Sequence, residues 1–189
     1  MSEFFDTLET RAPAAREAAL MAALPTQIAH AQTRTAAMAE ILAGVDAAGV
    51  TSRAALARLP VTRKSELLAR QQAVRAAGGD AFGGFAAIRR GAAMPRLYAS
   101  PGPIYEPEGT ARDYWRAARA MYAAGFRAGE LAHNAFSYHM TPGAFIMESG
   151  AHAVGCTVFA AGTGQTEQQL QAIADLRPQH RRNEWLWQA

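Results

Sequence analysis

The sequence predicts an α/β protein, in which an N-terminal helical arm is followed by an incomplete parallel-sheet α/β domain. Two observations predict this class. Residues 1–75 are rich in alanine and carry apolar residues at helical spacing, whereas residues 113–178 alternate strand-like and helix-like segments. Because short loops join these segments, the strands are expected to run parallel with right-handed crossovers. We therefore divide the chain into a helical arm (1–75), an irregular connector (76–112), βα units (113–178) and a tail (179–189).

The helical arm is expected to contain two long helices and two shorter ones. Residues 11–24 and 26–42 carry apolar stripes, and Pro25 is expected to separate them because proline cannot continue a helix without losing a hydrogen bond. Ser52 or Thr51 can cap a short helix that runs to residue 59, and Thr62 can cap another that begins at residue 63. Residues 76–109 are rich in glycine and proline, which predicts turns and irregular chain.

The βα units begin with a helix that Asp113 can cap and that ends near residue 125. A strand over 131–136, a helix over 142–154, a strand over 156–161 and a helix over 167–176 follow, with Thr166 as a cap of the last one. Ligands of parallel sheets bind beyond the carboxyl ends of the strands. The loops SYHMTPG and GTGQT, which follow the two strands, are therefore expected at the mouth of a site.

Composition narrows the class of protein. Half of the residues are hydrophobic and 19% are charged, which argues against disorder, and no apolar run approaches the ~18 residues that span a bilayer. The polar first residues do not resemble a secretory signal, so we expect a cytoplasmic protein. Cys156 is the only cysteine, which excludes an internal disulfide and a cysteine metal cluster. The net charge is +3, but the arginines are interleaved with glutamates, so we expect neither a nucleic-acid nor a membrane partner.

Several motifs, taken in order, carry a resemblance to a known family. LPVTRKSELL over residues 59–68 resembles a segment near the start of phenylacetate–CoA ligase-like proteins, which belong to the adenylate-forming (acyl-CoA synthetase) superfamily. Residues 122–178 are similar to a later stretch of the same proteins through AGFR (124–127), GE (129–130), GCTV (155–158) and GQTE (164–167). The resemblance covers roughly residues 3–178 and therefore only the N-terminal portion of that family.

The resemblance implies an enzyme that activates a carboxylic acid with ATP and Mg²⁺ and then transfers the acyl group to coenzyme A. The family's later nucleotide motifs, and the small C-terminal domain with its catalytic lysine, do not match any segment of this sequence. Lys64 is the sole lysine and lies in the helical arm. We therefore expect a fragment that is inactive alone, that uses no cofactor by itself, and whose tail over 179–189 arose by truncation or a frameshift. The alternative is a non-catalytic binding or interaction module derived from that fold, with self-association through its sheet.

The stretch LYASPGPIYEPEG occupies the place of the family's phosphate loop, S-S-G-T-T-G-K-P. Ser100, Gly102 and Pro107 match that pattern and form a nucleotide-loop remnant. The family's two threonines, second glycine and lysine are replaced by Pro103, Ile104, Tyr105 and Glu106. A unit-charge interaction at ~4 Å is worth about 4 kcal/mol at an effective dielectric of ~20, and replacing lysine by glutamate reverses its sign. We therefore expect the loop to have kept its fold and lost its phosphate chemistry.

The loop SYHMTPG resembles the family's aromatic loop, which helps to line the acyl pocket. The resemblance makes Phe136, Tyr138 and His139 candidates for contacting an aryl or other apolar carboxylic acid. The alternative is that Phe136 packs in the core while Tyr138 and His139 only close a loop. Glu148 and His152 are spaced to form a hydrogen-bonded pair on one helix face, with too few ligands for a metal site. No residue is assigned as catalytic.

Overall fold

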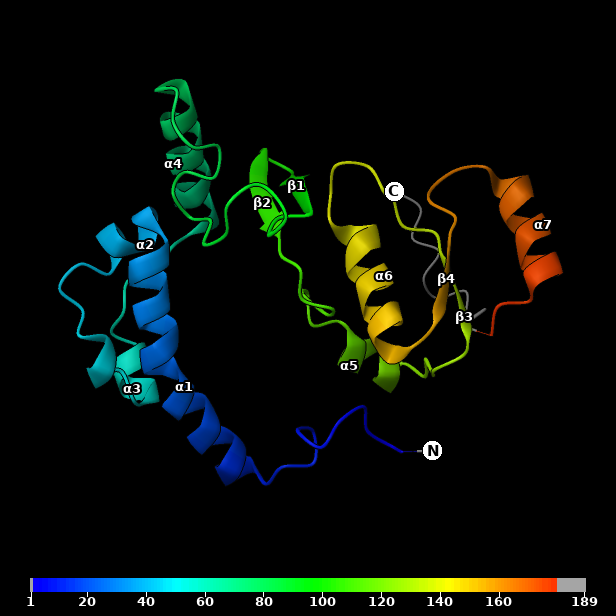
Figure 1. Cartoon of the computed structure of the whole chain (residues 1–189), viewed down its shortest axis with the longest axis horizontal. Helices are drawn as coiled ribbons and strands as arrows, with labels where there is room; N and C mark the ends of the chain where they lie inside the picture. Colours follow the sequence, from blue (N-terminus) through cyan, green and yellow to red (C-terminus); the bar gives the residue numbers. More distant parts are fainter. Residues whose placement is uncertain (1, 180–189) are drawn as a thin grey trace. The chain divides into compact units, whose positions relative to one another are not determined.

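The computed structural model describes residues 2–179, which fall into two compact units. One unit is formed by residues 11–109, and the other by residues 2–10 together with residues 110–179 (Figure 1). Helices combined with one antiparallel and one parallel pair of strands confirm the predicted α/β class. The predicted tail over 179–189 lies outside the described residues, except for Gln179. No helix within residues 2–179 is both long enough and apolar enough to cross a bilayer.

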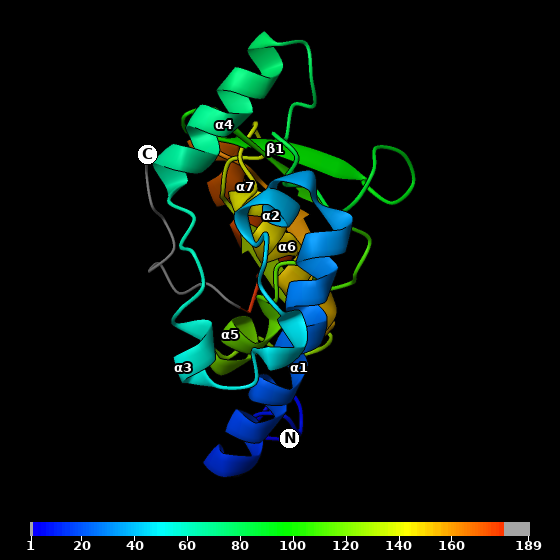
Figure 2. The same ribbon diagram turned by 90° about the vertical axis from the view of Figure 1, so that its left-hand side faces the viewer.

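The first unit begins with α1 (Pro13–Arg34), followed by α2 (Ala36–Ile41), the 3₁₀ helix η1 (Ala47–Gly49), α3 (Arg53–Leu56) and α4 (Lys64–Ala76). The prediction that Pro25 separates two helices is wrong, because α1 continues through it. Proline within a helix costs about 3 kcal/mol. Packing offsets that cost, since Ile28 on α1 forms a buried cluster with Leu42 and Val50, and α2 folds back against α1 (Figure 2).

Side-chain caps fix where the short helices begin. The hydroxyl of Ser52 accepts a hydrogen bond from the backbone N–H of Ala55 at 3.1 Å, as predicted for the start of α3. Helix α4 begins one residue later than predicted. Its cap position is Arg63 instead of Thr62, and the Glu66 carboxylate accepts the Arg63 backbone N–H at 2.9 Å. The carboxylate thus satisfies a backbone donor that precedes the first helical turn.

Residues 76–112, interpreted from the sequence as an irregular connector, contain a β-hairpin. Strand β1 (Arg96–Ser100) pairs antiparallel with β2 (Ile104–Glu108), and Ser100 lies opposite Ile104 beside the turn. Tyr98 and Ile104 are buried. Glu108, which is 5% exposed, accepts hydrogen bonds from the Tyr98 hydroxyl and from Arg96. Of the nucleotide-loop remnant, Ser100 and Gly102 therefore lie at the tip of a hairpin, whereas Pro107 lies within β2 opposite Leu97.

The second unit contains α5 (Ala118–Ala123), β3 (Leu131–Asn134), α6 (Gly143–Val154), β4 (Thr157–Ala160) and α7 (Thr166–Leu176). Strands β3 and β4 are parallel, as predicted, with α6 and α7 on opposite sides of the pair (Figure 1). The core between α5, α6 and the strands is made of small and medium apolar residues: Ala118, Met121, Ala132, Ala151, Val154 and Cys156. Gly150 allows α6 to approach the start of α5 closely, because a Cβ at this position would lie 2.8 Å from the Cβ of Ala117.

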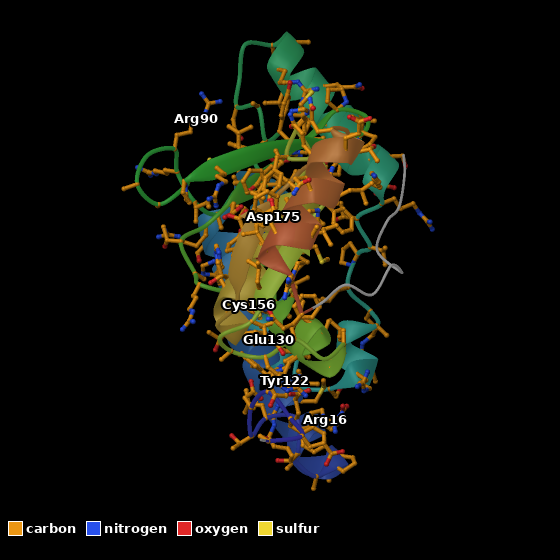
Figure 3. The ribbon with its side chains drawn as sticks, turned by 90° about the vertical axis from the view of Figure 1, so that its right-hand side faces the viewer. Arg16, Arg90, Tyr122, Glu130, Cys156 and Asp175 are labelled. Atoms are coloured by element: carbon orange, nitrogen blue, oxygen red, sulfur yellow. The ribbon has the colours of Figure 1, made fainter. Side chains whose placement is uncertain are left out.

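At the amino ends of the parallel strands, hydrogen bonds join the residues that precede β3 to the start of β4. The backbone N–H of Thr157 donates to the carbonyl of Glu130 at 2.8 Å, and Figure 3 shows Glu130 and Cys156 at this end. The Cys156 thiol contacts the Arg127 carbonyl at 3.2 Å. Burial, with a smaller effect from the Glu130 charge, raises the pKa of the Cys156 thiol. A buried thiol that favours its neutral form packs as a small apolar group.

Residues 2–10 pack against α5 of the same unit. The Asp6 carboxylate forms a salt bridge with Arg119 at 2.7 Å, and the hydroxyl of Tyr122 donates to the carbonyl of Ser2 at 2.6 Å. The ring of Phe5 lies 5.8 Å from that of Tyr122. The first residues of the chain thus belong to the unit formed by its second half.

Candidate functional site

The candidate site lies at the carboxyl ends of β3 and β4, where two loops leave the parallel strands. The carbonyl of Asn134, the last residue of β3, accepts hydrogen bonds from the backbone N–H groups of Ala161 and Gly162 at 3.0 and 3.1 Å. This carbonyl joins the start of the SYHMTPG loop to the chain that follows β4. The two loops predicted at the mouth of a site are therefore adjacent.

The side chain of Asn134 organises the first of these loops. Its Nδ2 donates to the Tyr138 hydroxyl at 2.8 Å and to the carbonyl of Ala144 at 2.9 Å, while its Oδ1 accepts the backbone N–H of Phe136 at 3.2 Å. Asn134 is 7% exposed, so these bonds replace the water that the amide would otherwise bind. Asn134 was not predicted as a site residue, although a polar amide that ends an apolar strand is a signal for this role.

Tyr138 is fixed on three sides. Its hydroxyl donates to Glu148 Oε2 of α6 at 2.8 Å, and its ring forms a T-shaped pair with that of Phe145 at a centroid distance of 5.2 Å. Burial first, and then the hydrogen bond to Glu148, raise the pKa of the Tyr138 phenol. A Cβ placed on Gly162 would lie 3.9 Å from the Tyr138 ring, so the ring also borders the turn after β4.

The other two predicted pocket residues differ in exposure. Phe136 is half-buried, and its ring lies 3.7 Å from a Cβ placed on Gly143, at the first residue of α6. His139 is exposed, and its backbone N–H donates to the Ser137 hydroxyl at 3.2 Å. The structure thus brings Phe136 and Tyr138 to the start of α6 and leaves His139 toward solvent.

The predicted pairing of Glu148 with His152 is replaced by a different contact, because the Glu148 carboxylate accepts the Tyr138 hydroxyl. The side chain of His152 is exposed, and its backbone carbonyl accepts a hydrogen bond from Arg112 at 3.0 Å. Within residues 2–179, no three His, Cys, Asp or Glu side chains gather in a way that would hold a metal ion.

The turn after β4 is held by the side chain of Gln169, which was not predicted as a site residue. Gln169 Nε2 donates to the carbonyls of Gly162 and Gly164 at 3.0 and 2.5 Å, and Gln169 Oε1 lies 2.9 Å from His133 Nε2. Thr166 was expected as the cap of α7 but is its first helical residue. The residue before it, Gln165, adopts a left-handed conformation with φ of 54°.

The nucleotide-loop remnant has partners inside its own unit. The Ser100 hydroxyl donates to the Glu106 carboxylate across the hairpin. The backbone N–H of Tyr105 donates to Gln71 Oε1 at 2.9 Å, and Gln71 Nε2 donates to the Tyr105 carbonyl at 3.0 Å. The Arg75 guanidinium lies 5.0 Å above the Tyr105 ring. The hydroxyl and the backbone N–H that a phosphate would need are thus engaged by protein groups.

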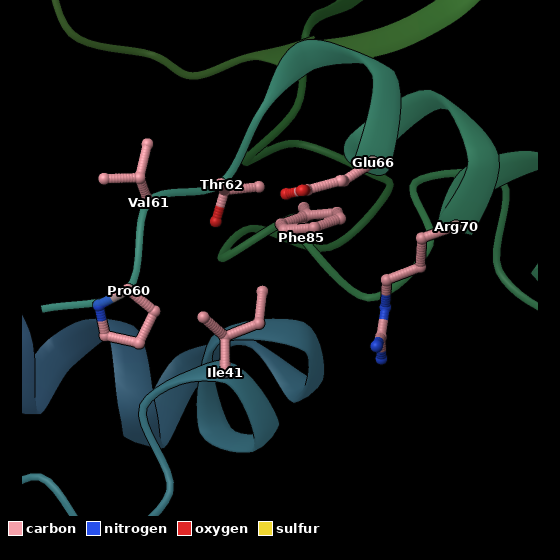
Figure 4. Close-up of a pocket in the computed structure, with 7 residues that line it drawn as sticks. All are labelled: Ile41, Pro60, Val61, Thr62, Glu66, Arg70 and Phe85. Atoms are coloured by element: carbon pink, nitrogen blue, oxygen red, sulfur yellow. The ribbon is translucent and has the colours of Figure 1, made fainter.

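A pocket of about 300 Å³ opens elsewhere in the unit formed by residues 11–109 (Figure 4). Its lining combines apolar side chains with one glutamate and one arginine: Ile41, Pro60, Val61, Thr62, Glu66, Arg70 and Phe85. The Arg70 guanidinium is paired with Glu40 at 2.7 Å and donates to the carbonyl of Gly83 at 2.8 Å. None of the predicted site residues lines this pocket.

Curated relatives of this chain are phenylacetate–coenzyme A ligases. The chain is 34% identical to the Thermus thermophilus protein in an alignment of 146 residues that covers 72% of this chain and 30% of the relative. It is 34% identical to the Aromatoleum evansii protein in an alignment of 142 residues that covers 71% of this chain and 30% of that protein. The chain therefore spans about 30% of the length of these curated relatives. No protein-family model matches it.

Solved structures with the same fold include those of 2-hydroxyisobutyryl-CoA ligase. The complex with 2-HIB-AMP and CoA in the thioesterification state matches with a TM-score of 0.77 and 21% identity, over 94% of this chain and 39% of that one. The postadenylation complex with 2-HIB-AMP matches with a TM-score of 0.74 and 22% identity, over 88% and 36% of the two chains. At these identities the likeness establishes the fold alone. Taken with the curated relatives, it shows that the chain belongs to the phenylacetate–CoA ligase-like branch of the adenylate-forming superfamily, whose N-terminal portion it matches.

Proposed function

We propose that this chain forms the acid-binding wall of an acid–CoA ligase. An aryl or other apolar carboxylic acid would lie against Phe136 and Tyr138, with His139 at the solvent side. The observation that supports this most is the fixed position of Tyr138, whose hydroxyl is held by Asn134 and Glu148 at 2.8 Å each. A ring that is ordered before its ligand arrives loses little rotamer freedom on binding, which favours affinity.

The reaction assigned by this proposal to a full-length relative is activation of a carboxylic acid with ATP, followed by acyl transfer to coenzyme A. The names of the curated relatives and the adenylate and CoA bound to the structural neighbour support it. In that reaction the described residues of this chain would bind and orient the acid. The hydroxyl of Tyr138 already donates a hydrogen bond to Glu148, so the ring offers an apolar surface to the acid.

The nucleotide-loop remnant does not fit the phosphates of ATP. Pro103 has no N–H to donate, and the Tyr105 N–H is bound to Gln71. The Ser100 hydroxyl is bound to Glu106, whose carboxylate would repel a phosphate. We therefore derive no nucleotide step through this loop, and we propose that the 189-residue chain alone does not complete adenylation.

Calorimetric titration with phenylacetate tests the acid-binding proposal. Saturable binding is expected, and Phe136→Ala should weaken it about tenfold, the effect of losing about 1.4 kcal/mol. Leu170→Ala is the matched control, because Leu170 is 62% exposed on α7 and its removal should leave the affinity within about twofold of the parent. No saturation by the unaltered chain, or equal effects of the two variants, would refute the proposal.

ATP–pyrophosphate exchange with a panel of aryl acids tests the second part. We expect no exchange above the rate without protein. Robust exchange by the purified chain would show that it carries out adenylation despite the engaged loop.

A second candidate function is an interaction module. Leu170 and Leu176 on α7 are 62% and 49% exposed, and apolar side chains exposed together can mark a contact with another protein. This candidate expects a second copy of the chain on α7, and light scattering after size exclusion would measure it. Conversion of a dimer to a monomer by Leu170→Glu would support it, whereas a monomeric parent chain would eliminate it.

A further inference from the structure

Gln169 differs from its neighbours on α7 in how its side chain is used. Gln168 next to it is exposed, whereas Gln169 is half-buried and reaches back over the turn that precedes the helix. Its Nε2 donates to two carbonyls, those of Gly162 and Gly164, at 3.0 and 2.5 Å. One side-chain amide thus spans the whole GTG turn, residues 162–164.

These two bonds fix which way the amide of Gln169 faces. Only the NH₂ group of an amide can donate to carbonyls, so Nε2 must face the turn and Oε1 must face His133. Gln169 Oε1 lies 2.9 Å from His133 Nε2. Because that oxygen can only accept, the proton of the neutral imidazole must be on His133 Nε2. In the neutral ring, the lone pair is then on Nδ1. The His133 ring is also stacked on that of Phe159, its register partner on β4, with a centroid distance of 5.4 Å.

The turn held by Gln169 borders Tyr138. The backbone of Gly162 is fixed at both ends, because its N–H donates to the Asn134 carbonyl at 3.1 Å and its carbonyl accepts from Gln169. The position of a Cβ on Gly162 is 3.9 Å from the Tyr138 ring. A shift of the turn therefore changes the space beside the ring that the proposed acid contacts.

We propose that Gln169 is the positioning residue of the acid site, and that it sets the GTG turn as the wall beside Tyr138. This inference rests on the proposed acid-binding function. Gln169 acts through the turn and does not touch the acid. Its contact with His133 orients the amide, so the strand pair, the turn and the aromatic loop are linked through one side chain.

Two variants of Gln169 separate its contacts. Gln169→Met keeps a similar volume and removes all three hydrogen bonds. Gln169→Glu keeps an oxygen acceptor for His133 but replaces both donors to the turn with a carboxylate that repels carbonyl oxygens. Gln168→Met and Gln168→Glu are the matched controls, because the same changes fall on an exposed neighbour.

Two measurements on the full chain are needed. The ¹⁵N shifts of the His133 ring report its tautomer, and the amide shifts of Gly162 and Gly164 report the turn. We expect the Nε2–H tautomer in the parent and in Gln169→Glu, a mixture in Gln169→Met, and shifted glycine amides in both Gln169 variants. Titration with phenylacetate should give about tenfold weaker binding for both Gln169 variants and less than about twofold for the Gln168 controls.

The outcomes separate the two proposals. Unchanged phenylacetate affinity in folded Gln169→Glu, with binding by the parent intact, overturns the positioning role and leaves the acid site standing. Glycine amide shifts that do not move in either Gln169 variant overturn it as well. If the parent binds no phenylacetate while the tautomer and amide shifts behave as expected, the acid site is wrong and Gln169 holds the turn for stability alone.

Discussion

Replacing Gln71 by leucine tests whether one buried amide holds the hairpin against α4. Gln71 is 1% exposed, and its amide makes two hydrogen bonds with the backbone of Tyr105, at 2.9 and 3.0 Å. Leucine fills a similar volume but leaves the Tyr105 N–H and carbonyl without these partners. A buried polar group that loses its partner costs about 1–3 kcal/mol. Because Tyr105 is only half-buried, we take about 1–1.5 kcal/mol for each group and expect a loss of about 2–3 kcal/mol.

Urea unfolding followed by circular dichroism at 222 nm measures this loss. With a slope of about 1.5 kcal/mol per molar urea, the midpoint should fall by about 1.3–2 M. The control is Gln72→Leu, which makes the same change at the next position of α4, where the side chain is exposed, and should stay within about 0.5 kcal/mol of the parent. If the two variants have equal midpoints, the amide does not hold the hairpin, and the account of how Tyr105 is engaged is wrong.

Three further substitutions have defined outcomes. Gly150→Ala places a Cβ 2.8 Å from that of Ala117. The temperature of thermal unfolding should therefore fall by the equivalent of about 1–3 kcal/mol, although alanine has the better helix propensity. An unchanged temperature would mean that α5 moves to make room for the added methyl group. Asp113→Ala removes a carboxylate that accepts the N–H groups of Ala117 and Ala118 at 2.9 and 3.1 Å, and urea unfolding should show a loss of about 1 kcal/mol. Folding raises the pKa of Tyr138, so the folded state favours the neutral phenol. The stability that the phenol contributes is therefore complete below about pH 10 and decreases above it by up to about 1.4 kcal/mol per pH unit. Tyr138→Phe should be less stable than the parent at pH 8 and should lose less stability between pH 8 and pH 11, and parallel pH curves would contradict this.

The order of helices and strands after residue 110 could be predicted because each segment is marked by its own periodicity and turn residues. Helix α1 could not, since its passage through Pro25 depends on contacts of Ile28 with residues of other elements. The hairpin was missed for a related reason. Strand β2 contains two glutamates and Pro107, which are unfavourable for a strand by composition, and it is held by Gln71 from α4.

The candidate site divides in the same way. The loops at the strand ends could be located from the sequence, because the carboxyl ends of parallel strands meet at one edge. The pairing of Tyr138 with Glu148 and that of Gln169 with His133 could not, because the partners come from different segments of the fold. Glu148 accepts a hydrogen bond from Tyr138, which lies 10 residues earlier in the chain. Gln169 contacts His133, which lies 36 residues earlier. Propensity and local motifs carry no information about such pairs.

The salt bridge between Asp6 and Arg119 has a consequence for how the chain folds during synthesis. Its partners are 113 positions apart, so the first segment of the second unit leaves the ribosome long before the helix that it packs against. At about 5–20 residues per second, the delay is about 6–23 seconds. Within this interval the helices of residues 11–76 can form from local contacts, whereas Phe5 and Asp6 must wait for α5. Residues 11–109 therefore separate, along the chain, two parts of one compact unit, and residues 2–10 are among the last segments to be placed.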